Sequence, residues 1–116
     1  MVDLCNCDQT VNLKVEADIG ADAIWCAKCY ANIDIELVPL SIELKSELAK
    51  WIFQYGEWID WNTDGIVQNG VELEVKHNKQ GLRLTEKVRK ELTGKYEVSF
   101  SPSTFAKRQS NKEFND

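Results

Sequence analysis

Four cysteines are the residues of this sequence whose types and spacing best support chemistry. They form two close pairs, Cys5-Asn6-Cys7 and Cys26-Ala27-Lys28-Cys29, separated by 18 residues. Tetrahedral zinc binds four sulfur ligands of this kind, and two short loops brought face to face by a β-hairpin can present them. Disulfides within either pair are disfavoured by bridge geometry, and disulfides between the pairs need an oxidising compartment, which nothing in the sequence indicates. We therefore expect one structural zinc ion, bound by Cys5, Cys7, Cys26 and Cys29.

This N-terminal part resembles a zinc ribbon, a small β-hairpin family in which two cysteine pairs hold one zinc ion. The resemblance covers residues 5–37, depends on the same four cysteines and does not extend to residues 38–116. It implies a hairpin between the two pairs and a zinc ion with a structural role. Four thiolates also fill the coordination shell, so no position is left for a reactive water molecule.

Two other functions of the cysteines stay open. Cys26 and Cys29 alone form a Cys-x-x-Cys motif, which would suit thiol-disulfide exchange or metal handling. That motif normally opens a helix, whereas here the residues after it, 30–35, have the pattern of a strand. Weak nucleic-acid binding through the zinc knuckle is the third alternative. A formal net charge of -5 disfavours it, because affinity for nucleic acid comes largely from Lys and Arg.

A second possible metal site lies in the middle of the chain. Residues 60–65 match the first half of a calcium loop, with Asp60, Asn62 and Asp64 as oxygen ligands. The twelfth position of such a loop needs a bidentate glutamate, and here it holds Val71. An ordinary turn is therefore favoured over calcium binding, since Asn, Asp and Gly are also preferred in turns.

Aromatic residues gather in one stretch of the sequence and suggest either a core or a binding surface. These residues are Trp51, Tyr55, Trp58 and Trp61. Core packing is the favoured interpretation, and an exposed patch that anchors a partner protein is the alternative. The single histidine, His77, is expected to be an exposed surface residue, because no nucleophile motif accompanies it.

Composition limits the class of protein. A chain of 116 residues with 43% hydrophobic residues suits one compact domain with a modest core. No apolar run reaches the roughly 20 residues that a membrane span needs, and residues 1–5 have neither the basic start nor the apolar stretch of a signal peptide. We expect a cytoplasmic protein whose partner is another protein, with no membrane association.

Hydrophobic periodicity predicts the elements that position these side chains. Apolar residues alternate at 10–17, 32–38 and 96–100, as in half-buried strands, and the apolar run at 23–26 is also predicted to be extended. A stripe from Leu44 to Ile59 predicts a helix over 42–60. Residues 71–77 fit a strand or a helix, and their composition favours one long helix over 70–93, in which Gly81 is the strong helix breaker.

The predicted fold is α+β: an N-terminal zinc-ribbon-like β-hairpin, a two-helix hairpin, and a small antiparallel sheet completed by a C-terminal strand. Residues 1–101 form a single domain, with the ribbon-like part at 1–38, the helical part at 41–94 and the last strand at 95–101. Residues 102–116 are expected to be a flexible tail. The favoured function is a non-enzymatic, zinc-stabilised protein-interaction or regulatory module.

Overall fold

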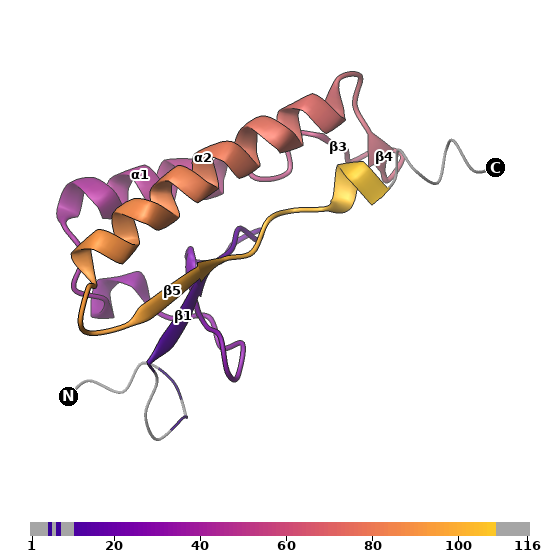
Figure 1. Ribbon diagram of the computed structural model, residues 1–116. Helices are drawn as coiled ribbons and strands as arrows, with labels where there is room; N and C mark the ends of the chain where they lie inside the picture. Colours follow the sequence, from indigo (N-terminus) through magenta and orange to yellow (C-terminus); the bar gives the residue numbers. More distant parts are fainter. Residues whose placement is uncertain (1–4, 6, 8–10, 109–116) are drawn as a thin grey trace.

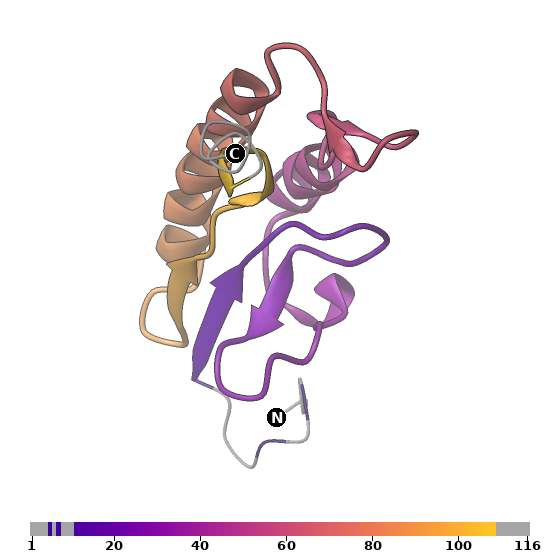
Figure 2. The ribbon, with the colours of Figure 1, turned by 90° about the vertical axis from the view of Figure 1, so that its right-hand side faces the viewer.

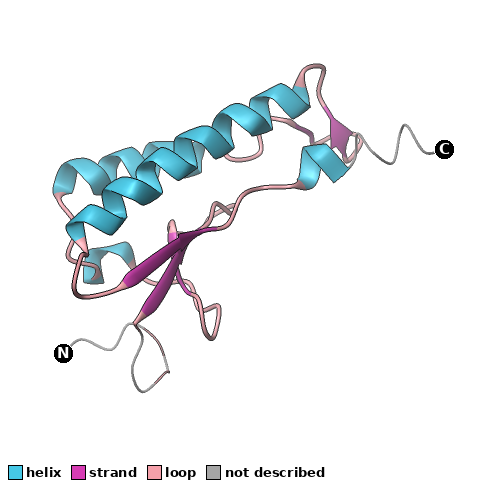
Figure 3. Ribbon diagram, viewed as in Figure 1, coloured by secondary structure: helices cyan, strands magenta, loops and turns pink. Residues whose placement is uncertain are grey.

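The computed structural model describes residues 5, 7 and 11–108 and has the α+β class that the sequence predicts (Figure 1). Its main sheet contains the strands β1 (Asn12–Val15), β2 (Ile24–Cys26) and β5 (Glu97–Phe100). Before β5 lie the short 3-10 helix η1 (Ile35–Leu37), α1 (Ile42–Phe53) and α2 (Gly70–Glu91), and a single helical turn follows β5 at residues 105–108. A separate hairpin of β3 (Ile59–Asp60) and β4 (Gly65–Ile66) lies between the two long helices in sequence (Figure 3).

The main sheet has the strand order β2-β1-β5 and is mixed. β1 pairs antiparallel with β2, so that Leu13 faces Cys26, and parallel with β5, so that Leu13 also neighbours Val98. The expectation of a wholly antiparallel sheet was therefore wrong for β5. Parallel neighbours need a long crossover connection, and here both long helices lie in the connection between β1 and β5.

The two long helices pack antiparallel and cover one face of the sheet (Figure 2). Ser41 caps α1 by accepting a hydrogen bond from the Leu44 backbone N–H, and its own N–H and hydroxyl both donate to Glu91 at the end of α2. Between the layers lies one continuous core of Leu13, Val15, Ile24, Leu44, Leu48, Leu84 and Val88, all of them buried. Neither α1 nor α2 combines the length and the apolar character that a membrane span requires.

The predicted strand over 32–38 was wrong. Within it, one isolated bridge joins Asn32 to Trp25, and the chain then forms η1. Two carboxylates cause the change: Asp22 accepts a hydrogen bond from the Ile35 N–H, and Asp34 accepts one from the Glu36 N–H. Such local side-chain bonds compete with the hydrogen bonds of a sheet.

The first predicted helix was too long. α1 ends at Phe53 rather than at residue 60, and Gly56 then adopts a φ of +90°. A left-handed conformation of this kind is easily available to glycine and interrupts a helix. The apolar stripe continues beyond it because Trp58, in the following turn, is buried and Ile59, in β3, is half-buried. The long helix predicted over 70–93 is confirmed as α2, including residues 71–77.

Residues 103–108, which belong to the segment expected to be a flexible tail, pack against α2 through Glu74. This carboxylate is 2% exposed and accepts hydrogen bonds from the Ser103 hydroxyl and from the backbone N–H groups of Ala106 and Lys107. These three hydrogen bonds satisfy the buried carboxyl group and tie the chain after β5 to the N-terminal part of α2. Residues 109–116 lie outside the described part.

Gly81 is a strong helix breaker inside α2, and the side chains packed around it explain why a glycine is needed there. A Cβ atom at this position would lie 2.6 Å from ring atoms of both Trp51 and Phe100, so only glycine lets the two rings approach the helix so closely. We expect Gly81→Ala to lower the free energy of unfolding by about 1–3 kcal/mol through overpacking. Thermal or urea unfolding measures the change, with the exposed Lys76→Ala as the control, which should alter stability by no more than about 0.5 kcal/mol. A Gly81→Ala protein stabilised by its better helix propensity would contradict this account.

Candidate metal centre

Cys26 and Cys29 lie at the two ends of a tight turn that follows β2. Cys26 is fully buried, and its backbone carbonyl accepts a hydrogen bond of 2.9 Å from the Tyr30 N–H. The Cys29 N–H points back at the Cys26 sulfur, 3.5 Å away. Tyr30 then takes a φ of +64° and turns the chain back beside β2. This knuckle places one thiol in the core and one, that of Cys29, at the surface.

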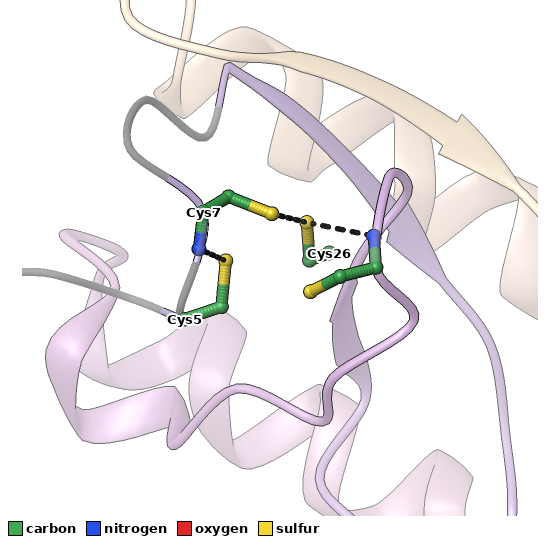
Figure 4. A group of neighbouring side chains, drawn as sticks. Cys5, Cys7 and Cys26 are labelled. Carbon is green, nitrogen blue, oxygen red and sulfur yellow. Dashed lines mark hydrogen bonds between the residues drawn. The ribbon is translucent and has the colours of Figure 1, made fainter.

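The N-terminal pair approaches this knuckle from the other side. Cys5 and Cys7 are half-buried against the core, and the Cys7 N–H donates to the Cys5 sulfur at 3.3 Å. Figure 4 shows Cys5, Cys7 and Cys26 turned toward a common centre. The Cys7 and Cys26 sulfurs are 4.0 Å apart, and all four sulfur atoms lie within 4.8 Å of one another.

These distances suit a metal ion better than a disulfide. Four sulfur atoms at about 2.3 Å from a central zinc lie about 3.8 Å from each other, close to the separations found here. A disulfide needs a sulfur-sulfur distance of about 2.05 Å, and the Cys7 and Cys26 sulfurs are almost twice as far apart. Four sulfur donors in this arrangement could hold a metal ion.

Within the cluster, the pKa values of the Cys26 and Cys7 thiols are shifted in opposite directions. Burial opposes ionisation of Cys26, but the backbone N–H groups of Cys29 and Lys28 and the thiols of Cys29 and Cys5 outweigh it and lower its pKa to about 6. Hydrogen bonds with the Cys5 and Cys29 thiols, together with burial, raise the pKa of Cys7 to about 12. The Cys26 thiol is thus ionised more readily than the Cys7 thiol, and a bound dication would favour ionisation of all four.

The aromatic residues of the helical region do not form one exposed patch. Trp51 and Trp58 are 2% and 1% exposed, and Tyr55 is half-buried with its ring edge-on to Trp58. Of the four aromatic residues considered as partner contacts, Trp61 alone is exposed, at 64%. Trp51 and Trp58 are therefore core residues, as the favoured interpretation predicted, whereas Trp61 lies at the surface, as the alternative predicted.

His77, expected at the surface, is instead 6% exposed and lies at the centre of this aromatic cluster. Its ring stacks on Trp51 with centroids 4.6 Å apart, and its Nε2–H donates to the Trp51 carbonyl at 2.9 Å. The Trp51 indole N–H donates in return to the His77 carbonyl. Burial lowers the pKa of His77, so its neutral form is favoured. The apolar stripe of α1 implies that some residue of α2 faces it, but it does not single out His77.

Asp60, Asn62 and Asp64 belong to the β3–β4 hairpin rather than to a loop between two helices. Asp60 Oδ1 accepts a hydrogen bond from the Asn62 N–H at 3.0 Å, and Asp64 has a φ of +58°. These features are typical of a tight turn. Among the described residues, the four cysteines are the one group of three or more His, Cys, Asp or Glu side chains whose ligand atoms converge.

Comparison with known proteins identifies the family. Residues 11–103 match the model of a family described as Serratia CdiI immunity protein-like, and no curated protein matches the chain. The match begins after Cys5 and Cys7, so half of the cysteine cluster precedes it, and the matching family is not a zinc ribbon. An immunity-like family indicates a role in protein-protein interaction. Because the match extends from just before β1 to just beyond β5, the chain belongs to the Serratia CdiI immunity protein-like family.

Proposed function

We propose that this chain is an immunity protein, which binds a toxin protein and blocks its action by covering part of its surface. The observation that carries the proposal is the family match over residues 11–103. Inhibition by binding requires a surface that is complementary to the partner and already ordered, because ordering it on binding would cost affinity. No reacting group is needed. The continuous core between sheet and helices supports this proposal by holding the surface loops in place.

We infer further that one zinc ion, bound by Cys5, Cys7, Cys26 and Cys29, fastens the N-terminal residues to the end of β2. The sulfur distances and the N–H groups directed at sulfur support this site. When four thiolates bind zinc, the ion contributes folding free energy and leaves no open position for chemistry. Such a site persists where thiols stay reduced, which is consistent with the cytoplasm.

Thiol-disulfide chemistry is the second candidate, and the lowered pKa of Cys26 is the observation that favours it. Two features of the structure oppose it. Cys26 is buried, and no helix begins at the knuckle to stabilise its thiolate. Iodoacetamide labelling at neutral pH separates the two candidates. Rapid labelling of one thiol would support redox chemistry, and labelling of all four thiols only after addition of a chelator would support zinc.

The immunity function is tested by protection from a toxin. An immunity protein guards the cell that makes the toxin, so the candidate toxin domains are those encoded in the same genome as this chain. Co-expression of the chain should restore growth to cells that produce one of these domains, and the purified pair should form a complex with a dissociation constant in about the nanomolar range or below. Leu48→Asp, which places a charge in the core, is the control and should abolish protection. If the folded wild-type chain protects against none of these toxins, the proposed function is wrong.

Metal analysis tests the zinc site. The full chain should contain about one zinc ion, and Cys29→Ser should lose it, whereas Ala27→Ser in the same knuckle should retain it. Chelation should lower the melting temperature of the wild type but leave Cys29→Ser unchanged. Because zinc competes with protons for the thiols, the affinity should fall as the pH is lowered from 8 toward 6. Wild-type protein that lacks zinc and melts at the same temperature with and without chelator would refute the site.

A further inference from the structure

Two loops that are distant in sequence meet at Gly56, after the end of α1. A Cβ atom at Gly56 would lie 3.2 Å from Trp61 Cζ2, 3.6 Å from Ile19 Cδ1 and 3.8 Å from Ile59 Cδ1. Ile19 belongs to the loop between β1 and β2, and Trp61 belongs to the β3–β4 hairpin. Figure 2 shows this loop and this hairpin extending toward the same side of the molecule.

The two apolar side chains that meet here are exposed. Trp61 is 64% exposed and Ile19 is 58% exposed, whereas Trp51 and Trp58 in the same part of the chain are buried. A single exposed apolar residue has little meaning, but adjacent ones from separate loops form a small contact surface. Tryptophan is also the side chain that most often dominates the binding energy of an interface.

Acidic side chains border this surface. Residues 16–24 and 53–68 contain Asp and Glu but no Lys, Arg or His. Asp18 directly precedes Ile19, Asp60 directly precedes Trp61, and Asp64 ends the turn of the hairpin. Asp18 and Asp64 are exposed and Asp60 is half-buried. None of the ion pairs within the described part of the chain involves these three carboxylates, so no basic side chain there neutralises them through an ion pair.

The basic side chains of the helical layer lie elsewhere. Lys50, Lys76, Lys79 and Arg83 outnumber the two carboxylates, Glu47 and Glu57, that line the same groove between α1 and α2. The acidic character of the two loops is therefore a local property of the surface and is stronger than the overall charge of -5 suggests. A surface of this kind attracts a basic partner and repels an acidic one.

The hairpin that carries Trp61 is ordered before any partner binds. Ile59 pairs with Ile66 across the strands, and the Val67 N–H donates to the Trp58 carbonyl at 2.9 Å. The Asp18 carboxylate also accepts a hydrogen bond from the Ile19 N–H at 2.8 Å. Binding through these loops would thus lose little conformational freedom.

We propose that Asp18, Ile19, Asp60, Trp61 and Asp64 form an acidic loop face through which the chain binds its toxin, and that the toxin presents a basic surface with an apolar recess for Trp61. This inference rests on the proposed immunity function and adds to it the place of contact and the chemistry of the partner. Trp61 and Ile19 supply the apolar contact, and the three carboxylates orient the partner and accelerate association.

The test uses the full-length chain and the purified toxin domain against which the wild type protects. Trp61→Ala should weaken binding at least tenfold, with Ile42→Ala as its control, because Ile42 is 82% exposed at the opposite end of α1. A triple variant, Asp18→Asn, Asp60→Asn and Asp64→Asn, removes three charges and keeps the side-chain shapes. It should slow association about tenfold at low salt and weaken the dependence of the rate on salt. Its control, Glu36→Gln, Glu43→Gln and Glu97→Gln, removes the same charge from exposed positions away from the hairpin.

The outcomes separate this inference from the proposed function. Folding of every variant is checked by circular dichroism and melting temperature. If the wild type binds the toxin and both loop-face variants bind it equally well, the loop face is not the contact and the immunity function still stands. If Lys50→Ala and Arg83→Ala weaken binding instead, the basic groove is the contact surface and this proposal is overturned. A wild-type chain that protects against no toxin contradicts the proposed function, and the loop face loses its basis with it.

Discussion

The contact between Trp51 and His77 holds the two long helices at one fixed position along each other. Each residue donates a side-chain N–H to the backbone carbonyl of the other, while their rings stack 10° from parallel. Most buried polar groups in proteins have such hydrogen-bond partners, because a buried donor or acceptor without one costs free energy. Because this pair fixes α1 against α2, it also sets the position of Gly81, beside which the Trp51 and Phe100 rings must fit. Phe100, whose ring also packs against Trp51, belongs to β5, the last strand of the sheet.

Local patterns in the sequence predicted the parts of the fold that local forces determine. Alternation of Leu13 and Val15 indicated β1, the stripe from Leu44 to Trp51 indicated α1, and the composition of residues 72–92 indicated α2. The predictions failed where single side chains or distant neighbours decide the structure. Asp22 and Asp34 take the N–H groups that a strand over 32–38 would have used, and the direction of β5 depends on the whole helical layer.

The candidate sites also differ in how far the sequence could predict them. Close spacing within each cysteine pair was enough to predict that the four sulfurs converge, because a hairpin between the pairs brings them together. The surroundings of His77 and Glu74 were not predictable, since burial of a polar residue depends on what packs against it. The meeting of Ile19 with Trp61 could not be predicted either, because neither loop has a pattern that specifies the other.

The parallel pairing of β1 with β5 has a consequence for how the chain is made on the ribosome. The first 29 residues contain β1, β2 and the four cysteines, so they leave the ribosome long before β5 does. The edge of β1 that pairs with β5 has no partner strand until residues 97–100 leave the exit tunnel. An unpaired edge is a template for association with other chains. Early closure of the cysteine end would hold the nascent hairpin in the correct shape during that interval and keep it ready for its last partner strand.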